Sequence, residues 1–323
     1  MAPRVATLNI GFLLIPDFSM MALSAATEPL RAANRQADAA HYAWHLLSVD
    51  GEQVASSSGF RLLPESSLQG AAALDMVFVV ASLGVASYRN RQVFDWLRRF
   101  AATGKPLGAI SVASFIVARA GLLDGYRCTI HWESLRDFAE AFPRTRPCRE
   151  IFVRDRNRLT CAGGTAALDL MLDLIASDHG AKLAAAVADN FLHSRIRPAG
   201  ESQRMAIHWR YGVSDSRLVK AIALMEQHVE DALGIEQIAA LVGVSARQFE
   251  RLFQTAFQRG PARFYQDLRL EEARRLLVES TESLAAIALR CGFVSASHLG
   301  RAFRAAFDRT PGEERRRARA APH

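Results

Sequence analysis

The chain has 323 residues, half of them hydrophobic, with a formal net charge of +7 and a pI near 9.7. This length allows two domains with separate cores, and no apolar run reaches the ~18 residues that a membrane span needs. The four cysteines show neither CxxC nor metal-ligand spacing, which favours a reduced cytoplasmic protein without metal or cofactor over a disulfide framework. The basic balance permits a polyanionic partner without specifying one.

Strand-like and helical runs alternate along the first half of the chain. We interpret "LNIGFLLI", which starts at residue 8, as a buried strand and not a signal peptide, because it is short, ends in Pro-Asp and lacks a cleavage site. Helices are expected at 18–35, near 90–103 and over much of 165–193. The other strand-like runs are "YAWHLLSV", "DMVFVVAS", "KPLGAIS", "RCTIHW" and the hairpin "EIFVRDRNRLTCAG". This alternation predicts a doubly wound, flavodoxin-like α/β fold, with a mostly parallel sheet and helices on both faces.

The alternation ends after residue 195. Residues 196–216 are rich in Pro, Gly, Ser and charged side chains, which indicates a linker between a first domain, 1–195, and a second, 217–323. From Arg217 onward the patterned stretches have helical period only. The second domain is therefore predicted to be all-α.

A repeated pattern fills most of the second domain. "IAALVGVSARQFERLFQTAFQRGP" (238–261) aligns with "IALRCGFVSASHLGRAFRAAFDRTP" (287–311), at a spacing of 49 residues before the turn and 50 after it. Each copy is read as helix, glycine-containing turn and helix, so we predict two helix-turn-helix units at about 235–257 and 284–307. A helix over 261–280 spaces them, which allows both second helices to enter major-groove segments about one turn apart.

The second helix of each copy has one apolar and one polar face. Gly243 and Gly292 supply backbone freedom at the turn, and Ser245 and Ser295 are the expected N-caps. A solvated face is the alternative for either helix alone, but two copies with matched turns favour DNA recognition. The side chains suited to base edges and phosphates are Ser245, Arg247, Gln248, Arg251 and Gln254 in the first copy and Ser295, Ser297, His298, Arg301 and Arg304 in the second.

Residues 217–317 resemble the DNA-binding domain of AraC/XylS-type bacterial transcription regulators. The second copy carries that family's Gly-Phe turn and its closing Thr-Pro. The family usually has Ser or Thr after Gly-Phe, where this chain has Val294, which leaves Ser295 as the cap. The resemblance implies a regulator, usually an activator, whose partners are double-stranded promoter DNA, RNA polymerase and a second copy of the chain.

The first domain is similar to the PfpI-protease/class I glutamine amidotransferase-like superfamily, in the form fused to AraC-type domains. The stretches that carry this likeness are "EPLRAANR" (28–35), "AGLLDG" (120–125) and "HW" (131–132). "PLGAISVASFIVARAGLLDG" is read as strand, sharp turn and helix, the setting of a nucleophile elbow. Catalytic members carry a cysteine at the elbow, a histidine about one strand later and an acidic residue after the first strand. Here these positions fall on Ser111, His131 and Met20 or Met21.

This substitution pattern favours a sensor over an enzyme. Serine is a poor nucleophile without an activating base, and methionine cannot orient His131, so the third catalytic member is missing. The elbow turn, at a helix N-terminus, suits a carboxylate, while Trp132, Glu133, Trp44 and Glu28 suit a cationic amine. The resemblance suggests a small nitrogen-bearing effector, such as arginine, glycine betaine or carnitine. The predicted ligand-binding residues are Ser111, Val112, His131, Trp132, Glu133 and Glu28.

Two other functions stay open for the first domain. It is an amidase- or protease-like hydrolase that uses Ser111 and His131, or it serves dimerisation alone. Purely structural roles are also open: His131 as a hydrogen-bonded core residue, Ser111 as the small residue of a tight turn, and Trp44 and Glu28 as packing residues. Cys128 and Cys161 are expected to be buried apolar fillers.

Overall fold

The computed structural model describes residues 7–71, 73–280 and 282–320. They form two compact units, of which the first ends at Arg204 and the second begins at Met205. The predicted linker, 196–216, is not unstructured throughout, because α7 (Ile207–Tyr211) lies within it. Ile207 and Tyr211 are one helical turn apart and both pack against the core of the second unit. The two units are described separately below.

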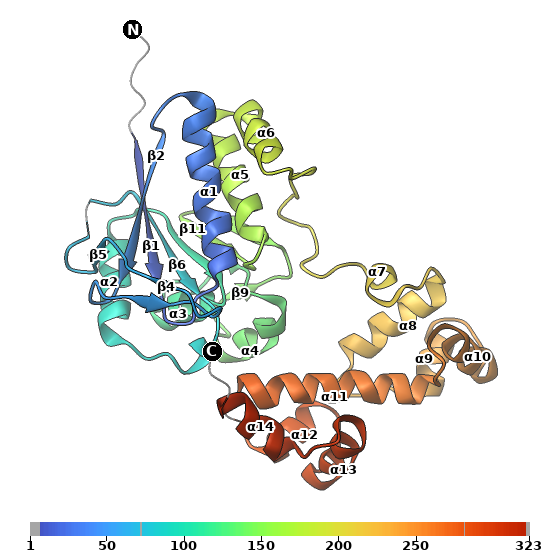
Figure 1. Ribbon diagram of the computed structural model, residues 1–323. Coiled ribbons are helices and arrows are strands. Elements are labelled where there is room, and N and C mark those ends of the chain that lie inside the picture. The colour runs from blue at the N-terminus through green and yellow to red at the C-terminus, as the bar shows by residue number, and fades with distance from the viewer. Residues whose placement is uncertain (1–6, 72, 281, 321–323) are drawn as a thin grey trace. The chain divides into compact units, whose positions relative to one another are not determined.

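A sheet of seven strands forms the centre of the first unit (Figure 1), in the order β10-β11-β7-β6-β1-β2-β5. Among these described strands, β10 alone runs antiparallel to its neighbour. The predicted doubly wound α/β fold and the predicted hairpin are therefore confirmed. The strands are β1 (Leu8–Leu14), β2 (Tyr42–Ser48), β5 (Ser66–Ser67), β6 (Met76–Ala81), β7 (Leu107–Ser111), β10 (Phe152–Asp155) and β11 (Arg158–Cys161).

Both faces of this sheet are buried, which explains why its strands have nearly continuous apolar sequences. Phe12 and Leu14 of β1 enter one core cluster, while Leu13 and the next residue after the strand, Ile15, enter the other. The first cluster is closed by α1 (Met20–Ala37), α5 (Ala166–His179) and α6 (Ala181–Asn190), which stand together in Figure 1. The second is closed by α2 (Arg91–Ala102), α3 (Ser114–Arg119) and α4 (Leu135–Ala141).

Short elements complete the first unit: β3 (Val54–Ala55) with β4 (Arg61–Leu62), β8 (Arg127–Cys128) with β9 (Arg146–Pro147), and the 3-10 turns η1 (Val85–Ser87) and η2 (Trp132–Ser134). The run "RCTIHW" thus gives only a two-residue strand outside the central sheet. Its amides are held by side chains instead: Arg127 N donates to Asp155 Oδ2 at 2.8 Å and Thr129 N to Thr160 Oγ1 at 2.8 Å.

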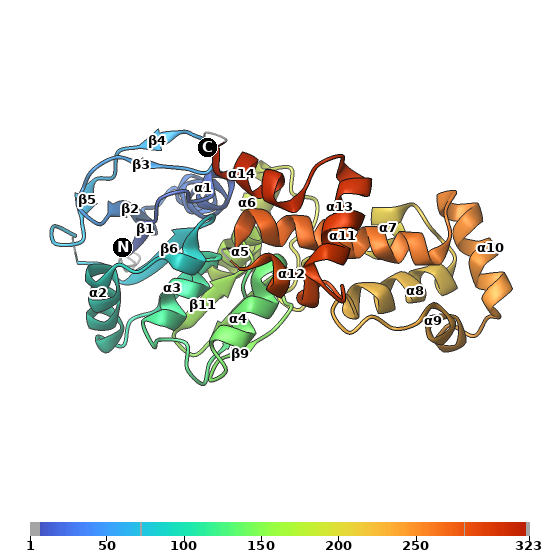
Figure 2. The ribbon, with the colours of Figure 1, turned by 90° about the horizontal axis from the view of Figure 1, so that it is seen from below.

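The described part of the second unit is helical, as predicted. Its helices are α7, α8 (Ser216–Gln227), α9 (Ile235–Leu241), α10 (Ala246–Phe257), α11 (Pro261–Glu279), α12 (Leu284–Arg290), α13 (Ala296–Phe307) and α14 (Pro311–Ala320). Helix α11 passes from a core with α8–α10 to a second core with α12 and α13 (Figure 2). Among the described residues of the whole chain, no helix has the length and apolarity to cross a membrane.

We expect Phe303→Ala to destabilise the second helix-turn-helix unit. Phe303 is fully buried, and its ring centroid lies 4.5 Å from that of Phe307. Truncation removes buried apolar surface and leaves a cavity, which should lower the free energy of unfolding by roughly 3–5 kcal/mol. Urea denaturation followed by circular dichroism measures this change.

The matched control is Val294→Ala, in the same unit, because the Val294 side chain is 82% exposed. Its free energy of unfolding should change by less than about 0.5 kcal/mol. Equal denaturation curves for Phe303→Ala and the parent chain would show that this face of α13 does not support the core.

Candidate DNA-binding helices and elbow site

The first helix-turn-helix unit joins α9 to α10 through Gly243. This glycine has φ +79°, a left-handed conformation that residues with a Cβ atom rarely adopt. Ser245 then caps α10: its Oγ accepts from Gln248 N at 3.3 Å, and Gln248 Oε1 accepts from Ser245 N at 3.1 Å. This reciprocal capping box confirms Ser245 as the N-cap and fixes where α10 begins.

The second helix-turn-helix unit joins α12 to α13 through Gly292, which has φ +68°. Here space adds a second constraint, because a Cβ on Gly292 would lie 2.7 Å from the carbonyl oxygen of Val229. The extra residue of this turn lets Phe293 enter the core while Val294 stays exposed. Ser295 Oγ accepts from His298 N at 3.1 Å, so the predicted N-cap is again confirmed.

Most of the predicted DNA-binding side chains lie on the exposed faces of α10 and α13. The exposed ones are Arg247, Gln248, Arg251 and Gln254 on α10 and Ser297, Arg301 and Arg304 on α13, with the caps Ser245 and Ser295 beside them. Phe249 and Phe253 on α10, and Leu299 and Phe303 on α13, face the cores. The two polar faces are therefore presented to solvent as the sequence pattern predicts.

Four of the predicted DNA-binding residues have structural contacts as well. The hydroxyl oxygens of Ser245 and Ser295 accept the N-capping hydrogen bonds, and the amide oxygen of Gln248 accepts from Ser245 N in the capping box. His298 is only half-exposed, since its ring packs edge-on against Phe293 with centroids 5.4 Å apart. We therefore rank the exposed arginines above these residues as candidates for base contacts.

Helix α11 ties the two helix-turn-helix units to one another. Near its start, the Tyr265 hydroxyl donates to the carbonyl of His228, just after α8. One turn later, Arg269 Nε donates to Cys291 O at 2.9 Å and Nη2 to Gly292 O at 2.6 Å. These bonds satisfy carbonyls at the C-terminus of α12 and place its turn against α11.

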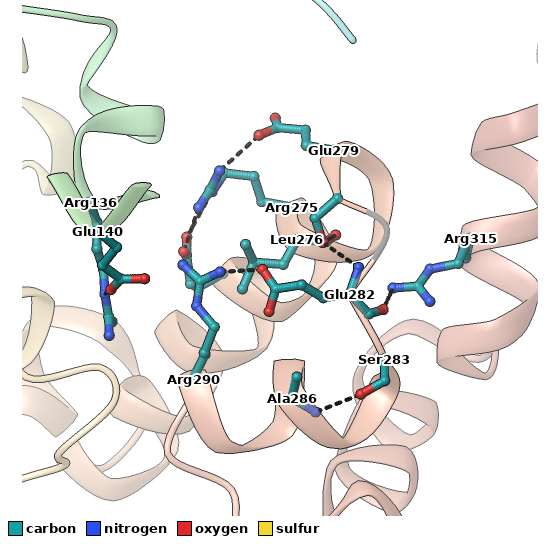
Figure 3. A network of polar contacts seen from close by, with 12 residues as sticks. Arg136, Glu140, Arg275, Leu276, Glu279, Glu282, Ser283, Ala286, Arg290 and Arg315 are labelled. Atoms are coloured by element: carbon teal, nitrogen blue, oxygen red, sulfur yellow. Dashed lines mark hydrogen bonds and ion pairs between the residues drawn. The ribbon is translucent and has the colours of Figure 1, made fainter. Parts of the chain in front are cut away.

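Polar contacts join the segment that follows α11 to α12 and α14 (Figure 3). Arg275 Nη1 donates to Glu279 Oε2 at 2.8 Å within α11. The Glu282 carboxylate pairs with Arg290 of α12, while the Glu282 carbonyl accepts from Arg315 Nη2 of α14 at 2.6 Å. These contacts position α12 and α14, which both contact α13.

The first unit contains a well-defined elbow. Ser111 ends β7 with φ +64°, a strained conformation for a non-glycine residue, and is 7% exposed. A Cβ on Gly163 would lie 2.5 Å from the Ser111 Cβ, so only glycine fits opposite the elbow. The following helix, α3, has six residues, so its dipole contributes less to anion binding than the sequence suggested.

The elbow lies at the carboxyl ends of the parallel strands. Ser111 pairs with Ala81 of β6, and β6 pairs with β1, so the turns after all three strands share one edge. The chain changes direction between β1 and β6, and this switch point is where open α/β sheets bind ligands. We call these three turns the elbow edge.

His131, Trp132 and Glu133 form one segment around η2. His131 Nδ1 lies 3.3 Å from Glu133 Oε2, so the expectation that His131 lacks an acidic partner is wrong. This acidic partner is two residues after His131 in the chain, whereas the family pattern places the acidic residue after β1. Trp132 is 37% exposed, and the Arg204 guanidinium carbon lies 4.3 Å from its ring centroid.

The other predicted ligand residues are placed less favourably. Glu28 lies two turns into α1, about 12 Å along the helix from its start beside the elbow edge, and pairs with Arg31 at 2.7 Å. Val112 packs against the core under α2–α4, so only its backbone is suited to a ligand. Trp44 packs against the opposite core. These placements favour structural roles for Glu28 and Trp44.

Sequence reasoning missed Asp17, which lies in the elbow edge between β1 and α1. It has φ +61°; its N–H donates to Ala55 O at 2.9 Å, and its carbonyl accepts from Leu83 N at 3.4 Å. The signal was available as the Pro-Asp pair after the first strand. Asp17 supplies the only carboxylate among the described residues 15–19 of that turn.

The cysteines near the elbow are buried, as predicted. Burial raises the pKa of Cys161 to about 12, although its strand neighbour Ile110 directly precedes Ser111. Burial likewise raises the pKa of Cys128 to about 12. Because the thiolate is the nucleophilic form, neither thiol replaces the missing elbow cysteine at neutral pH.

Two hollows in the surface lie away from the elbow. One, of about 680 Å³, is in the second unit and includes Trp209 and Lys220 of α7 and α8. The other, of about 300 Å³, is in the first unit between α5, α6 and the segment that follows them, including Leu172 and Pro198. Neither contains a predicted ligand residue.

Comparison with known proteins divides the chain in the same way. Residues 10–177 match the DJ-1/PfpI family, and residues 238–317 match a helix-turn-helix domain family. The chain is 41% identical over 307 residues to the HTH-type transcriptional regulator GbdR of Pseudomonas aeruginosa, covering 95% of this chain and 84% of that protein. The isonitrile hydratase of Pseudomonas putida is 31% identical over 168 residues, covering 52% of this chain and 70% of that enzyme.

A solved structure agrees with the first-unit fold. The crystal structure of an AraC family transcriptional regulator from Pseudomonas putida covers 57% of this chain and 99% of its own, with 32% identity and a TM-score of 0.53. Together with the two helix-turn-helix units and the elbow fold, these likenesses settle the family. The chain belongs to the AraC/XylS family of DNA-binding transcriptional regulators, among the members that carry a DJ-1/PfpI domain ahead of their helix-turn-helix domain.

Proposed function

We propose that this regulator activates transcription in response to a small nitrogen-bearing metabolite, which the elbow edge binds without chemical turnover. The observation that carries this proposal is an elbow that keeps its strained geometry but not its chemistry. Ser111 retains φ +64°, and in the described part of the chain no hydrogen bond joins its hydroxyl to His131. A serine nucleophile needs such a base within about 3 Å.

The chemistry around the elbow edge favours a ligand that bears a cationic nitrogen. Trp132 is partly exposed, and its face already attracts the guanidinium of Arg204. Glu133 adds a carboxylate beside it, which would interact with an ammonium group. A carboxylate on the same ligand would be met by backbone N–H groups at the elbow turn. An amino acid or quaternary amine combines these features.

A hydrolase remains the second candidate, and two observations favour it. His131 has an acidic partner in Glu133, which would orient its ring. The first unit is also related to an enzyme, the isonitrile hydratase of Pseudomonas putida. Turnover of an amide, ester or isonitrile by the full chain, lost in both Ser111→Ala and His131→Ala, would establish this function instead.

On the output side, we propose that α10 and α13 of each chain read adjacent major-groove segments of promoter DNA, in a homodimer that contacts RNA polymerase. The exposed arginines on both helices and the common support of α11 favour this arrangement. Promoter binding should weaken steeply with added salt, because arginine–phosphate contacts release counterions.

We expect Arg251→Ala and Arg301→Ala to weaken DNA binding without unfolding the chain. Both side chains are exposed and occupy equivalent positions, 50 residues apart. If each contacts a guanine, the variant should lose roughly 1–3 kcal/mol of discrimination at one base pair. Fluorescence anisotropy with DNA fragments selected from a random pool by the parent chain measures this loss.

Arg144→Ala is the matched control, since Arg144 is an exposed arginine of the first unit. It removes the same charge and should leave base discrimination unchanged. Parent-like binding by Arg251→Ala and Arg301→Ala, at several salt concentrations, would contradict the assignment of α10 and α13 as reading helices.

We expect Ser111→Trp to abolish effector binding while leaving DNA binding intact. The elbow has no room for an indole, because Ser111 is nearly buried against Gly163. A thermal-shift screen of the full chain with amino acids and methylated amines tests the parent. A ligand at a hundredfold excess over its dissociation constant stabilises the folded state by about 2.7 kcal/mol.

The same ligand should leave the melting temperature of Ser111→Trp unchanged, and the variant should bind its selected DNA fragment with parental affinity. A ligand response equal to that of the parent would show that the effector binds away from the elbow.

A further inference from the structure

Residues 193–204, which we call the exit segment, lead out of the first unit. The segment is attached to that unit at two places, and the two attachments differ in strength. At its start, the carboxylate of Asp169, a fully buried residue of α5, accepts from Arg197 N at 2.8 Å, Nε at 2.9 Å and Nη2 at 2.6 Å. His193 Nε2 lies 3.1 Å from the same carboxylate. Breaking this attachment would leave a buried charge unpaired, so we regard it as permanent.

The other end is held without a buried charge: Ser202 forms an isolated antiparallel bridge with Glu150, and the Gln203 amide is the side chain that is buried there. Gln203 Nε2 lies 2.9 Å from Thr129 Oγ1, 3.0 Å from Ile130 O and 3.0 Å from Glu150 O. The amide cannot be reversed, because its oxygen would then face two carbonyl oxygens. In this orientation Gln203 Oε1 is buried and has no hydrogen-bond partner among the described residues. The closed attachment therefore contains an unsatisfied acceptor, which reduces the cost of opening it.

Thr129 connects Gln203 to the elbow. Ser114 Oγ, three residues after Ser111, donates to Thr129 O at 2.7 Å, and both residues are fully buried. Thr129 N donates in turn to Thr160 Oγ1 at 2.8 Å. A displacement of the elbow turn would therefore act on the residue that holds Gln203.

The next residue, Arg204, contacts the proposed ligand segment directly. Its guanidinium carbon lies 4.3 Å from the ring centroid of Trp132, within the range of a cation–π interaction. Arg204 thus occupies the aromatic face that suits a cationic effector. Met205, the next residue along the chain, begins the second unit.

We propose that Gln203 and Arg204 form a latch that couples the elbow edge to the DNA-binding unit. With the latch closed, Gln203 holds the exit segment to Thr129 and Arg204 covers Trp132. A cationic effector competes with Arg204 for Trp132 and opens the latch, while the Asp169 attachment keeps the rest of the segment in place. Effector binding can favour the open state in this way because the closed state denies it the ring. This inference rests on the proposed function for the identity of the effector, but the latch itself does not.

Hydrogen–deuterium exchange on the full chain tests the latch without any ligand. Gln203→Met keeps the length of the side chain and removes its hydrogen bonds. Exchange should accelerate about tenfold at Thr129 and at Ile151, whose N–H donates to Ala199 O in the exit segment. It should also accelerate at the elbow helix, residues 114–119. The matched control is Arg195→Ala, which removes the exposed Arg195–Glu201 ion pair of the same segment and should leave the elbow helix unchanged.

Ser114→Ala tests the coupling from the other side. It should accelerate exchange at Ile151 severalfold, since coupling between two sites is reciprocal. If Gln203→Met accelerates exchange only near residue 203, and Ser114→Ala only near residue 114, the latch is overturned, whatever ligand the first unit binds. Tetramethylammonium chloride, compared with sodium chloride at equal concentration, should reproduce the Gln203→Met pattern at residues 199–203. If both variants behave as expected and this cation does not, the latch stands and the cationic effector class is wrong.

Discussion

One partly buried cation of α11 fixes the turn of the second helix-turn-helix unit. Arg269 of α11 donates to the carbonyls of Cys291 and Gly292, and its guanidinium carbon lies 4.5 Å from the ring centroid of Phe293. Burial lowers the pKa of Arg269, yet a guanidinium stays protonated under physiological conditions. Charged hydrogen bonds at a helix C-terminus, where carbonyls carry partial negative charge, are worth about 1.5–3 kcal/mol each. The turn of the second unit is therefore fixed to α11 by charge as well as by packing.

The turn of the first helix-turn-helix unit is held by a more exposed cation, because Lys220 Nζ of α8 donates to Leu241 O at the end of α9 at 2.6 Å. A Cβ on Gly243 would meet no heavy atom within 4 Å, whereas one on Gly292 would meet two backbone carbonyls. The glycine of the first turn is required by its φ alone, and that of the second by φ and space together. The two copies share a pattern in sequence, but the glycine of the second turn is the more tightly enclosed.

What could be predicted from the sequence was local or periodic. The helix-turn-helix units follow from a repeat, from glycines at left-handed positions and from serine caps, all of which act within a few residues. The parallel sheet follows from strands that are apolar on both faces. The elbow was found for the same reason, because strand, tight turn and helix are consecutive in the chain.

The features that the sequence did not predict depend on contacts between distant segments, or on which of two roles a side chain takes when its residue type suits both. Glu28 fits a cationic ligand by residue type, but its place in α1 pairs it with Arg31. Gln248 suits an adenine edge, yet the same amide completes a capping box, which sequence spacing alone does not rule out. Gln203 lies in the stretch whose composition predicts a linker, and its partners Thr129 and Glu150 are 74 and 53 residues away. Nothing in the local sequence marks it.

The elbow and the exit segment together suggest how a fold that is catalytic in related enzymes would serve as the switch that we propose. The proposed latch needs fixed geometry and no catalytic chemistry, because a displacement of the strained turn at Ser111 would reach Thr129 through the hydrogen bond of Ser114. The energies are of the right size: allosteric coupling is typically about 1–3 kcal/mol, or 5–150-fold in affinity. A neutral amide with one unsatisfied oxygen and a partly exposed cation–π contact fall in this range, whereas the buried Asp169–Arg197 pair would cost more than a small ligand could supply. Because linkage is reciprocal, DNA that selects the open state must tighten effector binding by the same factor.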